Sequence, residues 1–276
     1  MLKKLVVRLQ QGRRTIAYPA SEPNLPARFR GRPVIELSRC EQECTTCADV
    51  CPTGAIVRDT EADGLRLDLG RCLFCVECEA ACPSGAIRFG RDHRLAASHR
   101  EDLVSNGTEG ARLAEALSDR LCKLFGRSLK LRQVSAGGCN GCEADVSVLS
   151  TIVFDVGRFG IQLVASPRHA DGLLITGPVT ENMRAALEAA YAAVPSPKIV
   201  IAVGACAISG GPFAGYDEVH DGVSSVLPVD LFVPGCPPHP VTLLDGLLRM
   251  LGRLECDVTR HRALGTRSPI TRLEEA

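Results

Sequence analysis

Cysteine is the residue type with the clearest chemical use in this sequence, because all but two of the 14 cysteines fall into two spaced groups. The first group is a repeated run of four cysteines followed by proline. The two runs are Cys40, Cys44, Cys47 and Cys51, and Cys72, Cys75, Cys78 and Cys82. The second group is Cys139, Cys142, Cys206 and Cys236, each beside or near glycine. Sets of four thiolates are the usual ligands of iron–sulfur clusters, so the sequence predicts an electron carrier.

The repeated runs predict two [4Fe–4S] clusters that exchange ligands. In runs of this type three closely spaced cysteines bind one cluster, and the fourth, before the proline, binds the other. The first cluster is expected on Cys40, Cys44, Cys47 and Cys82, and the second on Cys51, Cys72, Cys75 and Cys78. Gly54 and Gly85 follow the two prolines and allow the backbone to pass close to a cluster.

Other interpretations of the repeat explain fewer of its residues. The spacing from Cys40 to Cys47 also occurs in radical S-adenosylmethionine enzymes, but that interpretation leaves Cys51 and the second run unexplained. Zinc sites use paired C-x2-C knuckles rather than triplets closed by Cys-Pro. Disulfides need an oxidising compartment, and the first residues do not resemble a secretory signal. We therefore expect a cytoplasmic protein whose thiols stay reduced.

Composition argues against nucleic-acid binding and against a membrane-spanning helix. Lys+Arg and Asp+Glu are both 32, aromatic residues make up 4%, and tryptophan is absent, so neither a basic surface nor a stacking platform for bases is expected. The longest uncharged stretch, from Ile199 to Tyr216, contains several glycines and Pro212. These residues predict a buried strand that continues into a loop.

The N-terminus predicts an amphipathic helix over residues 2–9. Its apolar face consists of Leu2, Leu5, Val6 and Leu9, and Lys3, Lys4 and Arg8 lie opposite. Such a helix can lie on a membrane or on a membrane subunit. It can equally pack on its own domain, and the sequence leaves both possibilities open.

The chain is predicted to contain two domains. Residues 1–97 form a small α+β domain of the two-cluster ferredoxin type, with a short strand at 64–69; residues 98–128 form a linker with an amphipathic helix at 109–125; residues 129–276 form the second domain. Cys122, beside the apolar stripe of that helix, and Cys256 are expected to be free buried cysteines.

The second domain is predicted to be an α/β domain with a flavodoxin-like parallel sheet. Strands are expected at 161–165, 172–176, 198–203 and 229–233, and helices at 142–154, 180–193 and 240–251. Ligands of such sheets bind at the carboxyl ends of the strands. Cys206 and Cys236 directly follow two of these strands, and Cys139 and Cys142 lie at the start of the first helix. We expect the four sulfurs to meet at one edge of the sheet.

The stretch from Arg132 to Pro240 resembles the small subunit of membrane-associated, energy-converting group 4 [NiFe] hydrogenases of the formate hydrogenlyase type. It also resembles the 20-kDa subunit of respiratory complex I, which carries the terminal cluster. The shared phrases are Arg158-Phe-Gly, Ser166-Pro-Arg-His-Ala-Asp, Thr176-Gly-Pro-Val-Thr and Val203-Gly-Ala-Cys-Ala. The first half resembles the 23-kDa ferredoxin-like subunit of the same complexes. The chain therefore resembles a fusion of two subunits that are usually separate.

The resemblance implies a third, proximal [4Fe–4S] cluster on Cys139, Cys142, Cys206 and Cys236. This cluster would exchange electrons with the nickel–iron site of a partner large subunit related to the complex I 49-kDa subunit. Membrane antiporter-like subunits and an upstream electron donor or acceptor protein are the other implied partners, and they would hold the chain on the cytoplasmic face of the membrane. No cysteines remain to bind nickel, so the chain is expected to be an oxidoreductase subunit without catalytic residues of its own.

The motif Cys139-Asn-Gly-Cys142 favours the hydrogenase side, because the complex I subunit has two adjacent cysteines at this position, next to quinone. Two alternatives stay open. The chain can be a quinone-linked relative of complex I, or a scaffold or relay subunit whose large partner lacks nickel.

Four other residues near the cysteines permit two interpretations each. Glu143 and Asp145 either belong to a proton path, as the resemblance implies, or stabilise the dipole at a helix N-terminus. His239 is either an extra ligand or hydrogen-bond donor of a cluster, or a loop or interface residue. Arg168 either raises a cluster potential or forms a plain ion pair.

Overall fold

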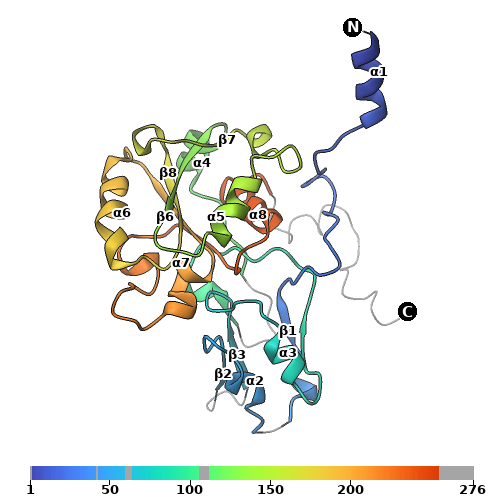
Figure 1. Cartoon of the computed structure of the whole chain (residues 1–276), viewed down its shortest axis with the longest axis vertical. Helices are drawn as coiled ribbons and strands as arrows, with labels where there is room; N and C mark the ends of the chain where they lie inside the picture. The colour runs from blue at the N-terminus through green and yellow to red at the C-terminus, as the bar shows by residue number, and fades with distance from the viewer. Residues whose placement is uncertain (1, 42, 60–63, 106–111, 255–276) are drawn as a thin grey trace.

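The computed structural model describes residues 2–41, 43–59, 64–105 and 112–254, and Cys256 lies outside these ranges. An α/β part carries the larger sheet, and a smaller part with short helices and strands packs against it (Figure 1). Single turns of 3-10 helix occur at Leu37–Arg39, Glu101–Leu103, Val156–Phe159, Pro167–His169, Gly211–Phe213 and Val223–Ser225.

The α/β part contains the predicted parallel sheet, with five strands in the order β10-β9-β8-β6-β7. The strands are β6 (Leu129–Ser135), β7 (Ile161–Leu163), β8 (Gly172–Thr176), β9 (Ile199–Val203) and β10 (Leu231–Val233). Every residue of β8 and β9 is buried. Their uninterrupted apolar sequences suit strands that are covered on both faces.

Helices cover both faces of this sheet. They are α5 (Gly141–Val148), α6 (Glu181–Ala193), α7 (Ala205–Ser209) and α8 (Pro240–Met250). Core residues of α5 and α8 pack with Leu174 and Ile201 on one face. Core residues of α6 and α7 pack with Leu173 and Val200 on the other. Helix α5 ends at Val148, whereas the sequence predicted a helix over 142–154.

The smaller part has the predicted α+β character. Strands β2 (Ile56–Asp59), β3 (Gly64–Asp68) and β5 (Val104–Ser105) form one antiparallel sheet, and β1 (Pro33–Ile35) pairs with β4 (Ile87–Phe89). Two short helices, α2 (Thr46–Asp49) and α3 (Glu77–Ala81), follow the first cysteines of each run. The core of this part is continuous with the α6 and α7 side of the larger sheet.

The prediction of one helix over 109–125 is wrong for the residues that the structure describes. Helix α4 spans only Asp119–Phe125. Upstream of it, the backbone N–H of Ala114 donates to the Ala96 carbonyl at 2.7 Å, and that of Leu117 to the Met250 carbonyl at 2.9 Å. These long-range bonds replace the helical ones. Cys122 lies in α4, half-buried, and its thiol donates to the Leu117 carbonyl.

The two parts are joined by main-chain contacts as well as by packing. Ala97 forms an antiparallel bridge with Phe232 of β10. Near the N-terminus, Arg158 donates from Nη1 to the Ile16 carbonyl and from Nη2 to the Tyr18 carbonyl, both at 2.8 Å. The N-terminal segment 13–32 therefore runs along the α/β part before it enters the smaller part.

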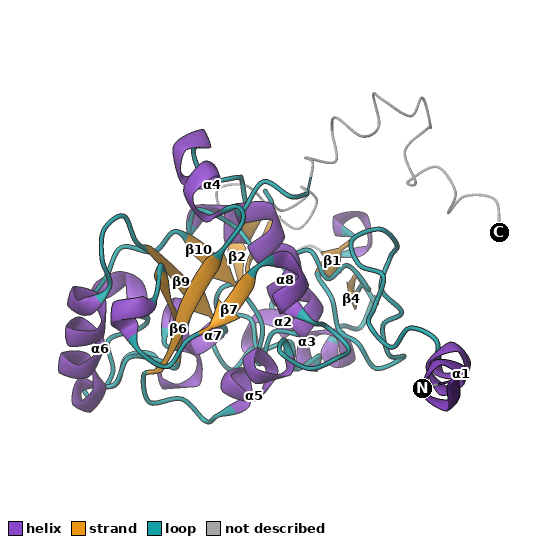
Figure 2. Cartoon of the chain, turned by 90° about the horizontal axis from the view of Figure 1, so that it is seen from above, coloured by secondary structure: helices purple, strands orange, loops and turns teal. Residues whose placement is uncertain are grey.

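Helix α1 (Leu2–Gln11) forms where it is predicted and stands clear of the rest of the chain in both views (Figures 1 and 2). Leu9 is 81% exposed and Val6 45%. No helix within the described residues has the length and apolar character needed to cross a membrane.

Candidate iron–sulfur sites

The second cysteine group gathers at the carboxyl ends of three parallel strands. Cys139 lies between β6 and α5, and Cys142 lies in the first turn of α5. Cys206 lies in α7 directly after β9, and Cys236 follows β10. Burial raises the pKa of Cys142, and negative charge on Cys206, Cys236 and Cys139 raises it further. Burial and the charges of Cys236 and Cys139 raise the pKa of Cys206 to about 11. A β-carbon at position 204 would lie 2.5 Å from the Cys142 sulfur and 3.4 Å from the Gly235 carbonyl oxygen, so the segments that carry these cysteines converge at one place, which we call the proximal site.

Glycines make room for the sulfurs of the proximal site. A β-carbon at position 204 would lie 2.5 Å from the Cys142 sulfur, and one at position 211 would lie 2.9 Å from the Cys206 sulfur. Both glycines also have positive φ angles, which side chains disfavour. Four soft sulfur donors in a recess kept free of side chains fit a [4Fe–4S] cluster. Within the described residues, no group of three or more His, Cys, Asp or Glu side chains is arranged around a single metal ion.

Glu143, which directly follows Cys142, is fixed by two hydrogen bonds. It is 9% exposed, and its Oε1 accepts hydrogen bonds from Ser135 Oγ at 2.6 Å and from Thr176 Oγ1 at 2.7 Å. Asp145, two residues further along α5, lines an open cavity, and burial raises its pKa. The two acids thus face different surroundings, although the sequence places them together.

The last cysteines of the two runs have matching environments in the smaller part. The backbone N–H of Ala55 donates to the Cys51 sulfur at 3.2 Å, and that of Ala86 to the Cys82 sulfur at 3.2 Å. Burial alone raises the pKa of both thiols, but hydrogen bonds from Thr53 to Cys51 and from Ser84 to Cys82 contribute to a net lowering. The repeat in the sequence is therefore also a repeat in structure, and both positions favour the thiolate that binds iron.

Three thiols of the first run lie close to one another. Burial, followed by the charges of Cys40 and Cys44, raises the pKa of Cys47 to about 11.

Burial raises the pKa of Cys72 to about 12, and Cys78, Cys51 and Cys75 add to the shift. The Thr53 hydroxyl, two residues after Cys51, donates to the Arg71 carbonyl at 2.7 Å, directly before Cys72, so Cys51 lies beside the second run although it belongs to the first run in sequence. Ligand exchange between the runs requires such a position of Cys51, and the matching position of Cys82 beside Cys40, Cys44 and Cys47 stays a prediction.

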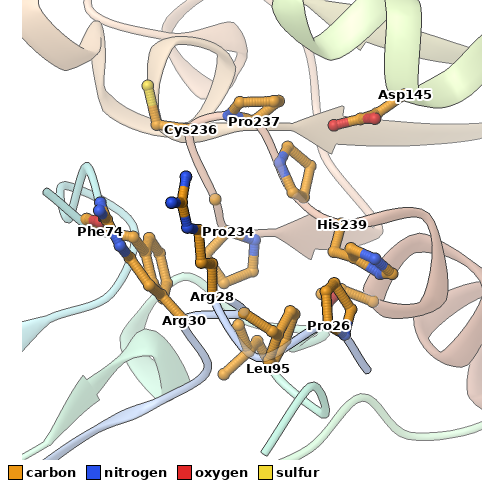
Figure 3. A pocket seen from close by; sticks show the side chains of 14 residues that line it. Pro26, Arg28, Arg30, Phe74, Leu95, Asp145, Pro234, Cys236, Pro237 and His239 are labelled. Carbon is orange, nitrogen blue, oxygen red and sulfur yellow. The ribbon is translucent and has the colours of Figure 1, made fainter. Parts of the chain in front are cut away.

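The second run lies next to the proximal site. Although Cys236 is exposed on one side, partial loss of water around its thiol raises its pKa, and the charges of Cys139 and of Cys75 raise it further. A cavity of about 300 Å³ lies beside two loops (Figure 3). One carries Cys72 and Cys75 and the other carries Cys236, and we call them the two ligand loops. Phe74 and Cys236 line it, together with Arg28, Arg30, Leu95, Asp145, His239 and neighbouring prolines. Two cysteine sets that are more than 50 residues apart in sequence thus come together here.

His239 and Arg168 occupy simpler positions. His239 precedes α8, and its Nδ1 accepts from the Val241 N–H at 3.2 Å, so it caps the helix. Its ring packs edge-on against Phe29, and burial lowers its pKa. Arg168 lies on the turn Pro167–His169 and is not among the residues that line the cavity.

Sequence reasoning missed Arg28 and Arg30 as residues of this region. They lie in a proline-punctuated segment without a motif, and only the tertiary path of that segment brings them to the two ligand loops.

Comparison with known proteins matches two separate segments of the chain to two families. Residues 39–86 match the model of the 4Fe-4S dicluster domain, and residues 139–250 match that of the NADH ubiquinone oxidoreductase 20 Kd subunit. The probable membrane-bound hydrogenase subunit mbhJ of Pyrococcus furiosus is 42% identical over 151 residues, which cover 55% of this chain and 90% of that protein.

Two further relatives are a formate hydrogenlyase subunit and an NADH-quinone oxidoreductase subunit. Formate hydrogenlyase subunit 7 of Escherichia coli is 47% identical over 135 residues, covering 49% of this chain and 53% of the relative. An NADH-quinone oxidoreductase subunit of Heliobacterium modesticaldum is 41% identical over 121 residues, covering 44% of this chain and 69% of the relative. The predicted fusion of a dicluster segment with a 20-kDa-subunit-like segment is confirmed.

Proposed function

Since this chain belongs to the family of the NADH ubiquinone oxidoreductase 20-kDa subunit and its hydrogenase relatives, with a 4Fe-4S dicluster domain on the same polypeptide, we propose that it is the electron-transfer subunit of a membrane-associated [NiFe] hydrogenase complex. The proposal assigns three [4Fe–4S] clusters. The ligand sets are Cys40, Cys44, Cys47 and Cys82 for the first ferredoxin site, Cys51, Cys72, Cys75 and Cys78 for the second, and Cys139, Cys142, Cys206 and Cys236 for the proximal site.

One observation supports a relay most directly, namely the closeness of Cys75 to Cys236. A [4Fe–4S] cluster accepts and returns one electron at a time. Phe74, which directly precedes Cys75, lines the same cavity as Cys236, and the charge of Cys75 raises the pKa of Cys236; both observations support neighbouring sites. Cys47 lies near Cys40 and Cys44, and its charge also raises the pKa of Cys78, a ligand proposed for the second ferredoxin site. We infer the order first ferredoxin site, second ferredoxin site, proximal site.

The large partner subunit is proposed to cover the proximal site. Cys139 and Cys236 are exposed, whereas Cys142 and Cys206 are partly buried. A thiolate site with one open side suits electron exchange with a second protein. The spacing Cys139-Asn-Gly-Cys142 and the similarity to two hydrogenase subunits favour a nickel–iron partner over a quinone-linked one.

Helix α1 supports a position at the cytoplasmic surface of the membrane. Residues 1–21 contain five basic residues and no acid, whereas the whole chain has a formal net charge of zero. An exposed amphipathic helix with a basic polar face fits an anionic lipid surface. We expect the purified chain to bind vesicles that contain anionic lipid, and Leu9→Glu to abolish that binding. Binding that is unchanged by Leu9→Glu would assign α1 to a protein partner instead.

The test of the relay is a co-expressed complex of this chain with its large subunit. Hydrogen is expected to reduce all three clusters in the complex and none in the isolated chain. Cys142→Ala should stop hydrogen-dependent reduction of both ferredoxin sites while leaving their iron in place. Cys75→Ala should spare the reduction of the proximal site and block transfer beyond it. Cys122→Ser is the matched control, because Cys122 is outside the three ligand sets, and it should leave the relay intact.

Two results would contradict the hydrogenase assignment. Reduction by a quinol, abolished by a quinone-site inhibitor and independent of hydrogen, would assign the chain to the complex I side. A complex that contains all the iron of this chain, about twelve atoms for three four-iron clusters, but shows no hydrogen-dependent reduction would indicate a large subunit without nickel.

A further inference from the structure

We propose that Arg28 and Arg30 raise the reduction potentials of the second ferredoxin site and the proximal site, so that both accept electrons within one narrow range of potential. The inference rests on the proposed function, because it concerns two of the three clusters assigned there. Both arginines lie in the N-terminal segment, outside either group of cysteines, and both line the cavity between the two ligand loops.

Arg30 acts on the second ferredoxin site. Its Nη1 donates a 2.9 Å hydrogen bond to the carbonyl oxygen of Phe74, which directly precedes Cys75. Phe74 has a left-handed backbone with φ of 53°, and its N–H donates to the Cys72 sulfur at 3.4 Å. A permanent positive charge is thus bonded to the loop that carries two ligands of this site.

Arg28 lies beside the loop that carries Cys236. Its side chain extends into the cavity, with the guanidinium group on the side where Cys236 lies, while the Cys236 sulfur points away from the cavity (Figure 3). Within the part of the chain that the structure describes, no carboxylate forms an ion pair with Arg28. Asp145 lines the opposite side of the same cavity. The Arg28 charge is therefore available to the ligand loop of Cys236.

Charge is the physical reason for the effect. Reduction of either site adds one electron and hence one negative charge, and a guanidinium group stays protonated at all working pH values. A nearby positive charge stabilises the reduced form and raises the potential.

The closeness of the two sites makes such a charge useful. Since Phe74, which directly precedes Cys75, and Cys236 line the same cavity, an electron on one site disfavours an electron on the other. A positive charge on each facing loop reduces that repulsion, and so both sites can be reduced without a large gap between them.

The experiment is a redox titration of the reconstituted full chain, followed by electron paramagnetic resonance. In Arg28→Gln we expect the one-electron reduction equilibrium of the proximal site to fall about tenfold, which corresponds to 59 mV. In Arg30→Gln the one-electron reduction equilibrium of the second ferredoxin site should fall by a similar factor. The first ferredoxin site should stay unchanged in both variants and so serves as the internal reference.

Two control variants separate charge from shape and position. Arg28→Lys keeps the charge and should hold the potential within about threefold of the unmodified chain. Arg184→Gln removes an exposed arginine from α6, where it pairs with Glu188, and should move none of the three potentials.

The possible failures are distinguishable. Full iron content with unchanged potentials in Arg28→Gln would overturn the inference and leave the relay standing. An equal fall at all three sites would overturn it too, because a general loss of positive charge would then explain the shift. Iron content of only two clusters in the unmodified chain would overturn the proposed function, and the inference with it.

Discussion

The hydroxyl group of Tyr18 donates a 2.5 Å hydrogen bond to Oδ1 of Asp245 and so joins the N-terminal segment to the middle of α8. Asp245 is fully buried, and its other oxygen accepts from Arg249 Nε at 2.9 Å. Burial and the Asp245 charge raise the pKa of Tyr18, which keeps its proton available for this bond. The contact positions the segment that carries Arg28 against the helix that follows Cys236.

Tyr18→Phe should lower the free energy of unfolding of the intact chain by about 1 to 3 kcal/mol, because Asp245 would keep its buried charge and lose a donor. Anaerobic urea denaturation, followed by circular dichroism, measures the change. Tyr216, which is 65% exposed, supplies the control: Tyr216→Phe should have no effect. Equal stability of the two variants would show that the Tyr18 hydroxyl contributes nothing.

His93 should make the chain less stable in mild acid. It is 3% exposed, its Nε2 has no hydrogen-bond partner among the described residues, and its ring packs edge-on against Tyr18. Burial lowers its pKa below the ordinary value of 6.5. Near pH 6.5 the unfolded chain therefore binds a proton that the folded chain does not bind. As a result, the free energy of unfolding falls as the pH drops from 7 through 6.5 towards the lowered pKa.

The measurement is urea denaturation of the unmodified chain and of His93→Leu between about pH 7.5 and 5.5. The difference between their free energies of unfolding should change by up to about 1.4 kcal/mol per pH unit, with the unmodified chain losing more. His169 is exposed, so His169→Gln should follow the unmodified chain. A parallel pH dependence of His93→Leu and the unmodified chain would contradict the assignment.

The sequence predicted those features that depend on neighbours along the chain. The strands β8 and β9 are continuous apolar runs, and Cys206 and Cys236 follow their strands directly, so their common edge could be inferred. Strand β6 was not among the predicted strands. Its sequence alternates buried Leu129 and Leu131 with charged residues and lacks the uninterrupted apolar pattern of its neighbours.

Contacts between distant segments could not be predicted in this way. Tyr18 meets Asp245 across 227 residues, and Arg30 meets Phe74 across 44. Nothing in the local pattern of the proline-punctuated segment specifies either contact. The same reason explains the shortened α4, since Ala114 and Leu117 satisfy their N–H groups with carbonyls of Ala96 and Met250.

Gly204→Ala should remove the proximal cluster selectively. The new β-carbon would lie 2.5 Å from the Cys142 sulfur, and the backbone has a φ of +89° that alanine disfavours. We expect the iron content to fall by about four atoms per chain, since one four-iron cluster is lost. The ferredoxin sites should keep their electron paramagnetic resonance signals.

Gly215→Ala separates the two effects of that substitution. Gly215 has a similar φ of +83° but no atom within 4 Å of a new β-carbon. This variant carries the backbone strain without the collision, so it should retain all three clusters. Equal iron loss in both variants would mean that strain, rather than space for the sulfur, explains the result.

Cys51→Ser tests which cluster each run completes. Although Cys51 belongs to the first run, it lies among Cys72, Cys75 and Cys78 and contributes to the raised pKa values of Cys72 and Cys78. The variant should therefore lose or alter the same electron paramagnetic resonance signal as Cys75→Ala, and not the signal that Cys44→Ala affects. Because the second ferredoxin site adjoins Cys236, Cys51→Ser should also interrupt electron transfer from the proximal site. A spectrum that matches Cys44→Ala would instead show that each run binds its own cluster, with no exchange of ligands.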